Sequence, residues 1–237
     1  LDNNVFSETF QIHGSAYGPN FNSYTLEIGS GVYPSTFTVI TTSNTPVING
    51  LLGTLNAQSF PNGKYTLRLT VQNNLGEIYR DSTIIYLGCM DLYDIAGMGN
   101  PTQAGISQTN VILCPGNYVT SGIITNLDNV KFDCNNAAII SSSYQLGYGI
   151  YAPYTSSYSS GVDNIIIKNC IIKNFYYGVA LFNSTNDTVE NNVFINNTRG
   201  LAFGSSIIPS LNNVAKSNTF LNNQIGLLIP APYSGNN

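Results

Sequence analysis

The chain has 237 residues, of which 8 are Lys or Arg and 12 are Asp or Glu, so only 8% are charged, against roughly a quarter in an ordinary soluble domain. So few cations exclude a clustered basic surface for nucleic acid, and a net charge of −4 argues against binding to an anionic membrane surface. Hydrophobic residues make up 43% of the chain, which is enough to build a core and excludes a disordered chain.

Residues 1–87 have the pattern of an antiparallel β-sandwich. From Lys64 to Gln72 apolar and polar residues alternate strictly, which predicts a half-buried strand between turn-forming segments. About seven short strands at this spacing indicate a sandwich. The segment from Leu52 to Val71 resembles the immunoglobulin-like or fibronectin-type modules of microbial surface proteins. Four further strands are expected at Thr9–Ser15, Ser23–Ile28, Phe37–Thr41 and Ile78–Tyr86.

Residues 88–237 contain a repeat. Cys170, Asn192 and Asn218 each begin a segment in which an Asn follows after four residues and a Gly after four more. The repeat length is first 22 and then 26 residues, and the segments are rich in β-favouring residues with no helical stretch. Periods of this kind predict a solenoid of stacked coils.

Each position of the repeat has an expected place in a coil. The apolar residue Ile172 and its equivalents Phe194 and Phe220 are expected to point inward. The turn residue Asn174 and its equivalents are expected to form a ladder of side-chain amides between coils. Gly178 and its equivalents are expected at sharp corners, because glycine adopts backbone conformations that other residues avoid.

The same alignment brings four charged residues to one station of successive coils, namely Asp133, Lys168, Glu190 and Lys216. Their signs alternate, as expected of an outward ladder of stacked opposite charges. We therefore assign these four a structural role and interpret the remaining cations, such as Arg199, as scattered solubilising charges.

The segments Asn129–Asn135, Asn164–Cys170 and Asn191–Asn197 resemble the right-handed parallel β-helix superfamily with the pectin-lyase-like fold. The resemblance is to its NosD-type short-repeat members, found in secreted microbial and archaeal surface proteins, and covers roughly residues 105–237. It implies an all-β protein in which the sandwich precedes a right-handed parallel β-helix of four to five coils. The superfamily includes lyases, hydrolases, adhesins, tailspikes and inert scaffolds, so the resemblance indicates a fold and not an activity.

Few residues are candidates for catalysis. Asp128 and Asp163 each precede the Asn that opens a coil, so they would stack roughly 5 Å apart, a spacing that suits a retaining glycosidase pair. The favoured interpretation is that each caps a turn. His13, the one histidine, is interpreted as structural. Because metal-ligand clusters are absent from the sequence, we expect no metal, no cofactor and no catalytic residue, and the copper association of the NosD name is not carried over.

The four cysteines, Cys89, Cys114, Cys134 and Cys170, lack the spacing of a zinc site and are expected to form two disulfides. Three connectivities are possible from the sequence alone. The coil alignment puts Cys134 next to Cys170 on adjacent coils, which favours that pair. Cys89 is then left with Cys114, which would fix the interdomain segment to the first coil.

Two features indicate export, and a third excludes a membrane span. The chain starts at Leu1 with neither Met nor a leader, as a processed protein would. Glycosylation sequons occur at Asn183, Asn186 and Asn196. No apolar run approaches the roughly 18 residues of a membrane span. We expect an extracellular or cell-surface location.

The segment from Ser141 to Gly161 is expected to loop out of the coil and is rich in tyrosine. Its tyrosines would offer a protein interface or a surface for sugar stacking, or would fold back half-buried over the coil. They are Tyr144, Tyr148, Tyr151, Tyr154 and Tyr158.

The sequence favours a non-enzymatic structural subunit of an extracellular assembly, such as a filament, sheath or surface layer, built from copies of this chain. No capping helix follows the last repeat, so an open β-helix end is expected to associate end to end with another chain. The alternatives are a polysaccharide-binding or polysaccharide-cleaving protein with a cell-surface glycan as partner, or an adhesin or tailspike-like module. Nucleic acid binding and membrane insertion are not expected.

Overall fold

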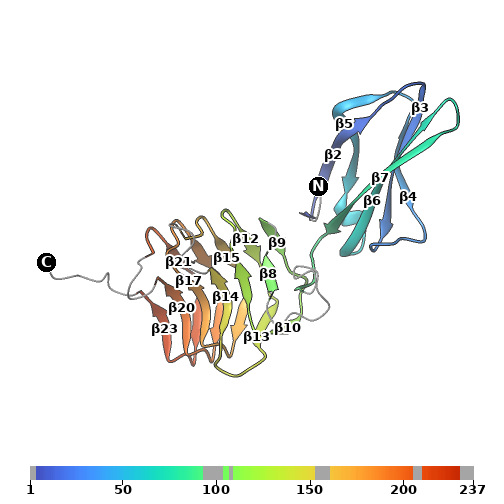
Figure 1. Cartoon of the computed structure of the whole chain (residues 1–237). Coiled ribbons are helices and arrows are strands. Elements are labelled where there is room, and N and C mark those ends of the chain that lie inside the picture. The colour runs from blue at the N-terminus through green and yellow to red at the C-terminus, as the bar shows by residue number, and fades with distance from the viewer. Residues whose placement is uncertain (1–3, 93–103, 107–108, 153–160, 205–209, 230–237) are drawn as a thin grey trace. The chain divides into compact units, whose positions relative to one another are not determined.

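The computed structural model describes residues 4–92, 104–106, 109–152, 161–204 and 210–229. These residues lie mostly in strands, whose order is shown in Figure 1. The chain divides into two compact units, Leu1–Met90 and Asp91–Asn237. In the described ranges no helix has the length and apolar character needed to cross a membrane.

The first unit is a β-sandwich. Five strands form one sheet in the order β1-β7-β6-β3-β4, and β2 pairs with β5 in a second sheet. Ile12 and Leu52 from the small sheet share one core with Leu26, Leu67 and Ile85 from the large sheet. The strands are β1 (Val5–Phe6), β2 (Thr9–Ala16), β3 (Phe21–Ser30), β4 (Thr38–Ser43), β5 (Val47–Asn56), β6 (Gly63–Asn73) and β7 (Ile78–Leu87). The predicted sandwich is confirmed.

Strand β5 was not anticipated from the sequence pattern. Its apolar residues do not alternate with polar ones, and Gly50 and Gly53 interrupt the run. Its register with β2 shifts twice, and Asn49 takes a left-handed φ of 48°. An irregular register moves side chains between faces, which removes the period of two on which the prediction depends.

The second unit is a parallel β-helix with three parallel sheets. Five complete coils follow β8, and crossovers between parallel strands are right-handed in nearly all proteins. The first sheet has β8 (Ala104–Ile106), β11 (Ile123–Thr125), β14 (Tyr148–Ala152), β17 (Tyr177–Leu181), β20 (Arg199–Phe203) and β23 (Ile225–Leu228). The second has β9 (Asn110–Ile112), β12 (Lys131–Asp133), β15 (Ile166–Lys168), β18 (Thr188–Glu190) and β21 (Val214–Lys216). The third has β10 (Asn117–Thr120), β13 (Ala138–Ser141), β16 (Ile171–Lys173), β19 (Val193–Ile195) and β22 (Thr219–Leu221).

The β-helix core is built from columns of apolar side chains. Phe132, Ile167 and Val189 occupy one register position on successive coils and are fully buried. Ile172 and Phe194 form a second column, and the ring of Phe220 stacks on that of Phe194 with centroids 5.1 Å apart. The expected inward positions of the repeat are therefore confirmed.

The expected amide ladder between coils is present, but other asparagines of the repeat form it, and the expected corner role of Gly was wrong. Asn174 and its equivalents Asn196 and Asn222 are the corner residues, with left-handed φ values of 65°, 54° and 54°. Gly178 lies inside β17, where a Cβ would meet the carbonyl oxygen of Gly200 in the next coil at 2.4 Å. Glycine is needed there because two coils approach closely, and asparagine makes the corners because it tolerates the left-handed conformation.

Candidate functional site

An outward ladder of charges runs across β12, β15, β18 and β21. Asp133 pairs in register with Lys168, which pairs with Glu190, which pairs with Lys216. Salt bridges of 3.0 Å and 2.8 Å join Lys168 to Asp133 and Lys216 to Glu190. Partial burial of Asp133 opposes ionisation, yet hydrogen bonds from Asn169 and Asn135 and the nearby Lys168 leave its carboxyl pKa lowered. The predicted charge ladder is confirmed, and these charges serve the contact between coils.

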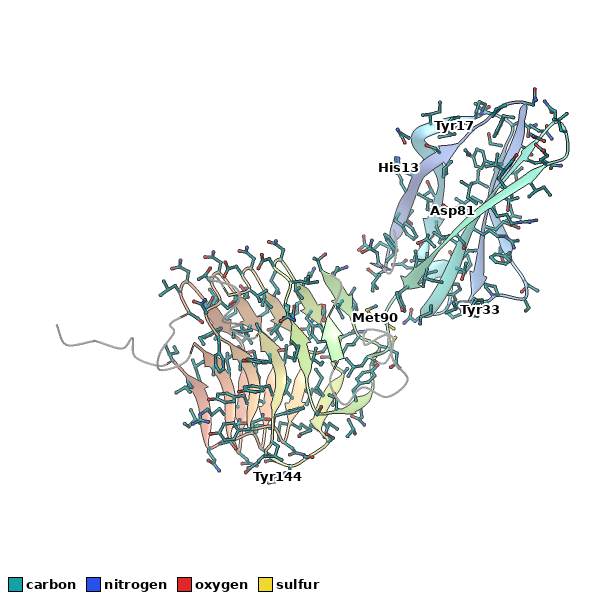
Figure 2. All side chains as sticks on the ribbon, in the orientation of Figure 1. His13, Tyr17, Tyr33, Asp81, Met90 and Tyr144 are labelled. Carbon is teal, nitrogen blue, oxygen red and sulfur yellow. A yellow bond between two sulfur atoms is a disulfide. The ribbon has the colours of Figure 1, made fainter. Side chains whose placement is uncertain are left out.

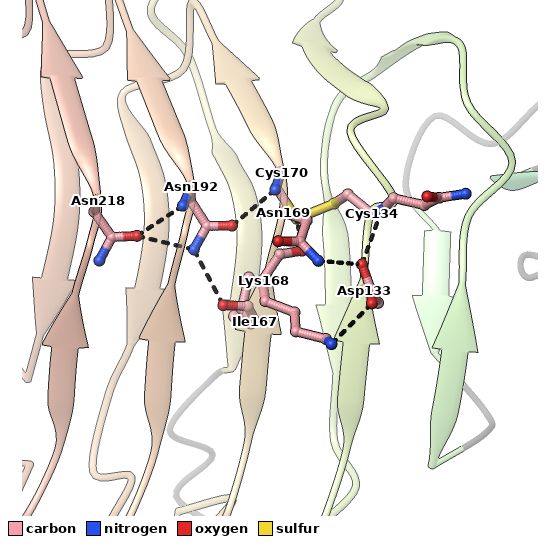
Figure 3. Close-up of a disulfide and its surroundings, with 9 residues drawn as sticks. Asp133, Cys134, Ile167, Lys168, Asn169, Cys170, Asn192 and Asn218 are labelled. Carbon is pink, nitrogen blue, oxygen red and sulfur yellow. Dashed lines mark hydrogen bonds and ion pairs between the residues drawn. A yellow bond between two sulfur atoms is a disulfide. The ribbon is translucent and has the colours of Figure 1, made fainter.

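A ladder of side-chain amides, formed by the buried Asn192 and the half-buried Asn218, closes the corner before the third sheet, as Figure 3 shows. Asn192 Oδ1 accepts the N–H of Cys170 at 2.9 Å, and Asn192 Nδ2 donates to the carbonyl of Ile167 at 3.1 Å. Asn218 in the next coil accepts the backbone N–H of Asn192 at 2.9 Å and donates from Nδ2 to Val189. Each amide therefore satisfies backbone groups that a corner would otherwise bury unpaired.

A second ladder of asparagine amides closes the corner before the first sheet. Asn197 Oδ1 accepts the N–H of Phe175, and Asn223 Oδ1 accepts the N–H of Asn197, both at 2.9 Å. The residues that form the ladders directly follow the left-handed corner residues. The repeat pattern had assigned the ladder to those corner residues instead.

Asp187 occupies the equivalent corner before the second sheet and is fully buried. Its Oδ1 accepts the N–H of Ile165 at 2.9 Å, and the hydroxyl of Ser184 contacts both Asp187 Oδ2 and the carbonyl oxygen of Val162. The Ser184 hydroxyl has one proton and can donate it to only one of these two oxygens. If it donates to the carbonyl of Val162, its contact with Asp187 is a hydrogen bond only when the Asp187 carboxyl is protonated and donates to Ser184 Oγ. Burial raises the pKa of Asp187 to about 6 despite the hydrogen bonds from Ser184 and Ile165, and the charge of Asp163 adds to the rise.

The candidate catalytic pair has a structural arrangement. Asp128 Oδ1 accepts the backbone N–H of Asp163 at 2.9 Å, and Asp163 Oδ1 accepts the backbone N–H of Thr185 at 2.8 Å. Each carboxylate therefore holds the turn of the following coil. Asp187 was missed because a single Asp at an Asn position carries no repeat signal.

Cys134 and Cys170 are joined by a disulfide with Cα atoms 4.8 Å apart. It links the second and third coils. Asp133 directly precedes Cys134, and its register partner Lys168 lies two residues before Cys170 (Figure 3). Cys89 and Cys114 belong to different units, and their pairing stays a prediction.

The tyrosine segment is in part a strand, which corrects the expected loop. Tyr148 and Tyr151 lie in β14 with rings stacked 4.2 Å apart, and Tyr148 also stacks on Tyr177 at 5.2 Å. Tyr144 is 67% exposed in the turn before β14. Two members of the segment, Tyr154 and Tyr158, lie outside the described residues. The role of these tyrosines as an interface stays a prediction.

Arg199 is not a scattered solubilising charge. It follows Tyr148 and Tyr177 in the same column, and its guanidinium carbon lies 4.7 Å and 4.9 Å from the ring centroids of Tyr176 and Tyr177. Cation–π attraction and packing of its stem tie it to the aromatic rings of this face. Sequence reasoning missed this role because it depends on the register of β17 and β20.

The three sequon asparagines all lie at corners. Asn183, Asn186 and Asn196 have left-handed φ values of 56°, 59° and 54°. Asn186 is exposed and the other two are half-buried. Their glycosylation stays a prediction.

The last described coil leaves one edge of each sheet unpaired. Strands β21, β22 and β23 are terminal in the three sheets. Core columns that are closed in earlier coils become open here, since Leu201 is 0% exposed and its equivalent Leu227 is 40% exposed. Among the described residues no acceptor is recorded for the backbone N–H of Asn213, Asn218 or Asn223. This coil therefore offers apolar surface and hydrogen-bond donors together.

The family model for the periplasmic copper-binding protein NosD matches residues 76–237, which include the whole parallel β-helix. The chain belongs to the NosD family. No curated protein matches it. The solved structure of pectate lyase Pel3 from Pectobacterium carotovorum is similar at 10% identity and a TM-score of 0.21, over 90% of this chain and 77% of the lyase. A TM-score this low supports no conclusion about function.

The residues of this NosD-family chain do not fit a copper centre. Copper in proteins prefers thiolate, thioether and imidazole ligands. The matched stretch contains no histidine, because His13 is the one histidine of the chain, and no cysteine is free. Of its two methionines, Met90 is 1% exposed and Met98 lies outside the described residues. Within the described parts of the chain, no three His, Cys, Asp or Glu side chains gather as metal ligands would.

Proposed function

We propose that this chain is a non-enzymatic structural subunit of an assembly outside the cytoplasm, in which copies associate through the coil of β21, β22 and β23. The observation that carries the proposal is the set of three corner N–H groups, on Asn213, Asn218 and Asn223, that have no recorded acceptor in the described structure. In the preceding coils the equivalent groups are satisfied by the amide or carboxyl of the next coil. A further layer of strands stacked on this coil would supply acceptors for these three N–H groups.

Apolar surface supports the same proposal. Ala215, Phe220 and Leu227 stand in columns whose members in earlier coils are buried, and all three have solvent access. Unpaired edge strands with apolar neighbours are templates for pairing with another chain. A second copy would cover this surface and supply the missing strand partners. Filament, sheath and surface layer are the assemblies that such repeated contacts would produce.

Two observations support a location outside the cytoplasm. The family description names periplasmic proteins, and a disulfide within the β-helix persists in an oxidising compartment. The non-enzymatic part of the proposal is supported by the structural use of the carboxylates. Asp128, Asp163 and Asp187 all accept backbone N–H groups of neighbouring coils or turns.

The test compares the full chain with Leu227→Lys and, in case that variant folds poorly, Ala215→Lys. Light scattering over a range of concentrations should show association of the native chain and at least a tenfold weaker association of both variants. Leu146→Lys is the matched control, because Leu146 is 65% exposed but lies in the turn before β14. A native chain that stays monomeric at high concentration across salt conditions, or association equal in all variants, would overturn the proposal.

A further inference from the structure

A cleft of about 540 Å³ lies at one end of the sandwich unit, between the turn from β2 to β3 and the turn from β6 to β7. Such a volume is within the range of small-molecule sites. Figure 2 shows Tyr17 at this end and Tyr33 at the opposite end of the unit. The apolar and aromatic lining consists of Tyr17, Pro19, Phe21, Val71, Leu75 and Tyr79.

The two turns that frame the cleft are fixed by hydrogen bonds. Asn74 donates its backbone N–H to the carbonyl of Asn20 at 2.8 Å, which ties one turn to the other. Asn73 is buried, and its Oδ1 accepts the N–H groups of Leu75 and Glu77 at 3.0 Å and 2.9 Å. The cleft is therefore preorganised, which reduces the entropy lost on binding.

One carboxylate is positioned at the cleft. Asn73 Nδ2 donates to Glu77 Oε2 at 2.6 Å, and the hydroxyl of Tyr79 donates to the same oxygen at 3.2 Å. No partner is recorded for Glu77 Oε1 in the described structure, and no Lys, Arg or His lines the cleft. The charge of Glu77 and its hydrogen bond raise the pKa of Tyr79, as expected for a negative local potential.

The rings beside this carboxylate are open to solvent. Tyr17 is 59% exposed and Tyr79 is 61% exposed, while Leu75 at the rim is 73% exposed. Aromatic and apolar side chains that gather in one cleft with a few fixed polar groups are typical of a ligand-binding site. Aromatic faces with a nearby anion attract organic cations by cation–π and Coulombic terms together.

We propose that this cleft binds an organic ammonium group, held between Tyr17 and Tyr79 and paired with Glu77. A neutral sugar would also stack on tyrosine but would need several free hydrogen-bonding groups, and both polar atoms of Asn73 are already engaged. The ammonium group belongs either to a small quaternary amine or to a lysine side chain of a polypeptide. This site is independent of the association proposed for the β-helix.

The test is a titration of the full chain followed by amide chemical shifts. Tetramethylammonium and N-acetyl-lysine amide should shift residues 17–21 and 73–79, while the neutral tert-butanol and glucose should not. Tyr79→Leu should weaken ammonium binding about tenfold, and Glu77→Gln should weaken it several-fold and remove its salt dependence. Tyr33→Leu is the matched control, because Tyr33 is 96% exposed in the same unit but outside the cleft.

The outcomes separate the ligand sources. Tighter binding of tetramethylammonium assigns the site to a small quaternary amine, and tighter binding of the lysine derivative assigns it to a polypeptide. Binding of tert-butanol or glucose as strong as that of the cations would overturn the proposal. Ammonium binding unchanged in both Tyr79→Leu and Glu77→Gln would overturn it as well.

Discussion

The early and late coils of the β-helix close the same three corners with different side chains. The coil of β15, β16 and β17 places Ile165, Cys170 and Phe175 there, and the next two coils place Asp187, Asn192 and Asn197 followed by Asn213, Asn218 and Asn223. An apolar corner is held by burial and, at Cys170, by a covalent bond. A polar corner is held by side-chain amides, or by the carboxyl of Asp187, which accept backbone N–H groups of the coil before. The same corner backbone can therefore be held either by buried apolar or disulfide-linked side chains or by side chains that hydrogen-bond to the coil before.

The largest expected effect comes from removing the covalent link of the early coils. Replacing Cys134 and Cys170 by Ala should lower the free energy of unfolding of the β-helix by about 4 kcal/mol, because the bond closes a long loop. Hydrogen exchange of the amides in β15 and β16 measures this loss. A chain with Cys134→Ala and Cys170→Asn should recover part of it. The Nδ2 of the new asparagine can donate to the carbonyl of Phe132 as Asn192 does to Ile167, although the N–H of Ala137 is already engaged with Cys134. If the double alanine variant and the variant with Cys170→Asn exchanged their amides at equal rates, a polar corner could not replace the disulfide-linked one.

The next effect concerns an internal amide. Asn192→Ala removes the acceptor of the Cys170 N–H and the donor to the Ile167 carbonyl, so the loss should be about 3 kcal/mol. Exchange of the Cys170 amide should then be at least tenfold faster. Asn218→Ala is the matched control in the last described coil. Asn218 is only half-buried, so water can take the place of its amide and the loss should be about 1 kcal/mol. A similar loss of unfolding free energy in both variants would show that the contribution of a ladder amide does not depend on its position in the stack of coils.

The smallest effect is a dependence on pH at Asp187. Its folded pKa of about 6 is above its ordinary value of 3.8, so the folded state binds the proton more tightly than the unfolded state. Stability is therefore greatest below about pH 4 and falls as pH rises to about 6, by no more than about 3 kcal/mol.

Denaturant unfolding at pH 4, 5, 6 and 7 measures this fall. Asp187→Asn should remove it and stabilise the protein at pH 7, because Asn is the residue of the other polar corners. Asp128→Asn, at an exposed position, is the control and should keep the fall. A native profile that is flat between pH 4 and 7 would contradict the buried protonated carboxyl.

The repeat spacing was enough to predict the register of the β-helix. A constant offset between repeats fixes which residues stack on successive coils. The alternating charges of Asp133, Lys168, Glu190 and Lys216 provided a test of that register, and the strand pairing agrees with it. The offset alone could not predict which asparagine of a corner adopts the left-handed backbone conformation and which one hydrogen-bonds to the neighbouring coil. Asn191 and Asn192 are identical residues, and only the backbone shows that the first turns the chain while the second joins the coils.

The features that were missed depend on contacts between distant segments. Tyr148 meets Tyr177 because β14 pairs with β17, although the segment had the composition of a loop. The cleft of the sandwich depends on the bond between Asn74 and Asn20, two turn residues far apart in the chain. The two turns of the cleft do not repeat, so no internal alignment could indicate that they meet. The tyrosine strand does repeat, since Tyr148-Gly149 aligns with Tyr177-Gly178, but at an interval longer than the periods of 22 and 26 residues that defined the coils.

The one-way direction of the amide ladders has a thermodynamic consequence. Each polar coil takes its donors from the coil before and offers its own corner N–H groups to the next, as Asn192 does toward Asn218. Adding a coil moves the three open donors along without increasing their number. The free-energy penalty of an open end is therefore constant, whereas the favourable stacking energy grows with every layer. If copies associate as we propose, each added layer would therefore lower the free energy of the stack without adding open donors.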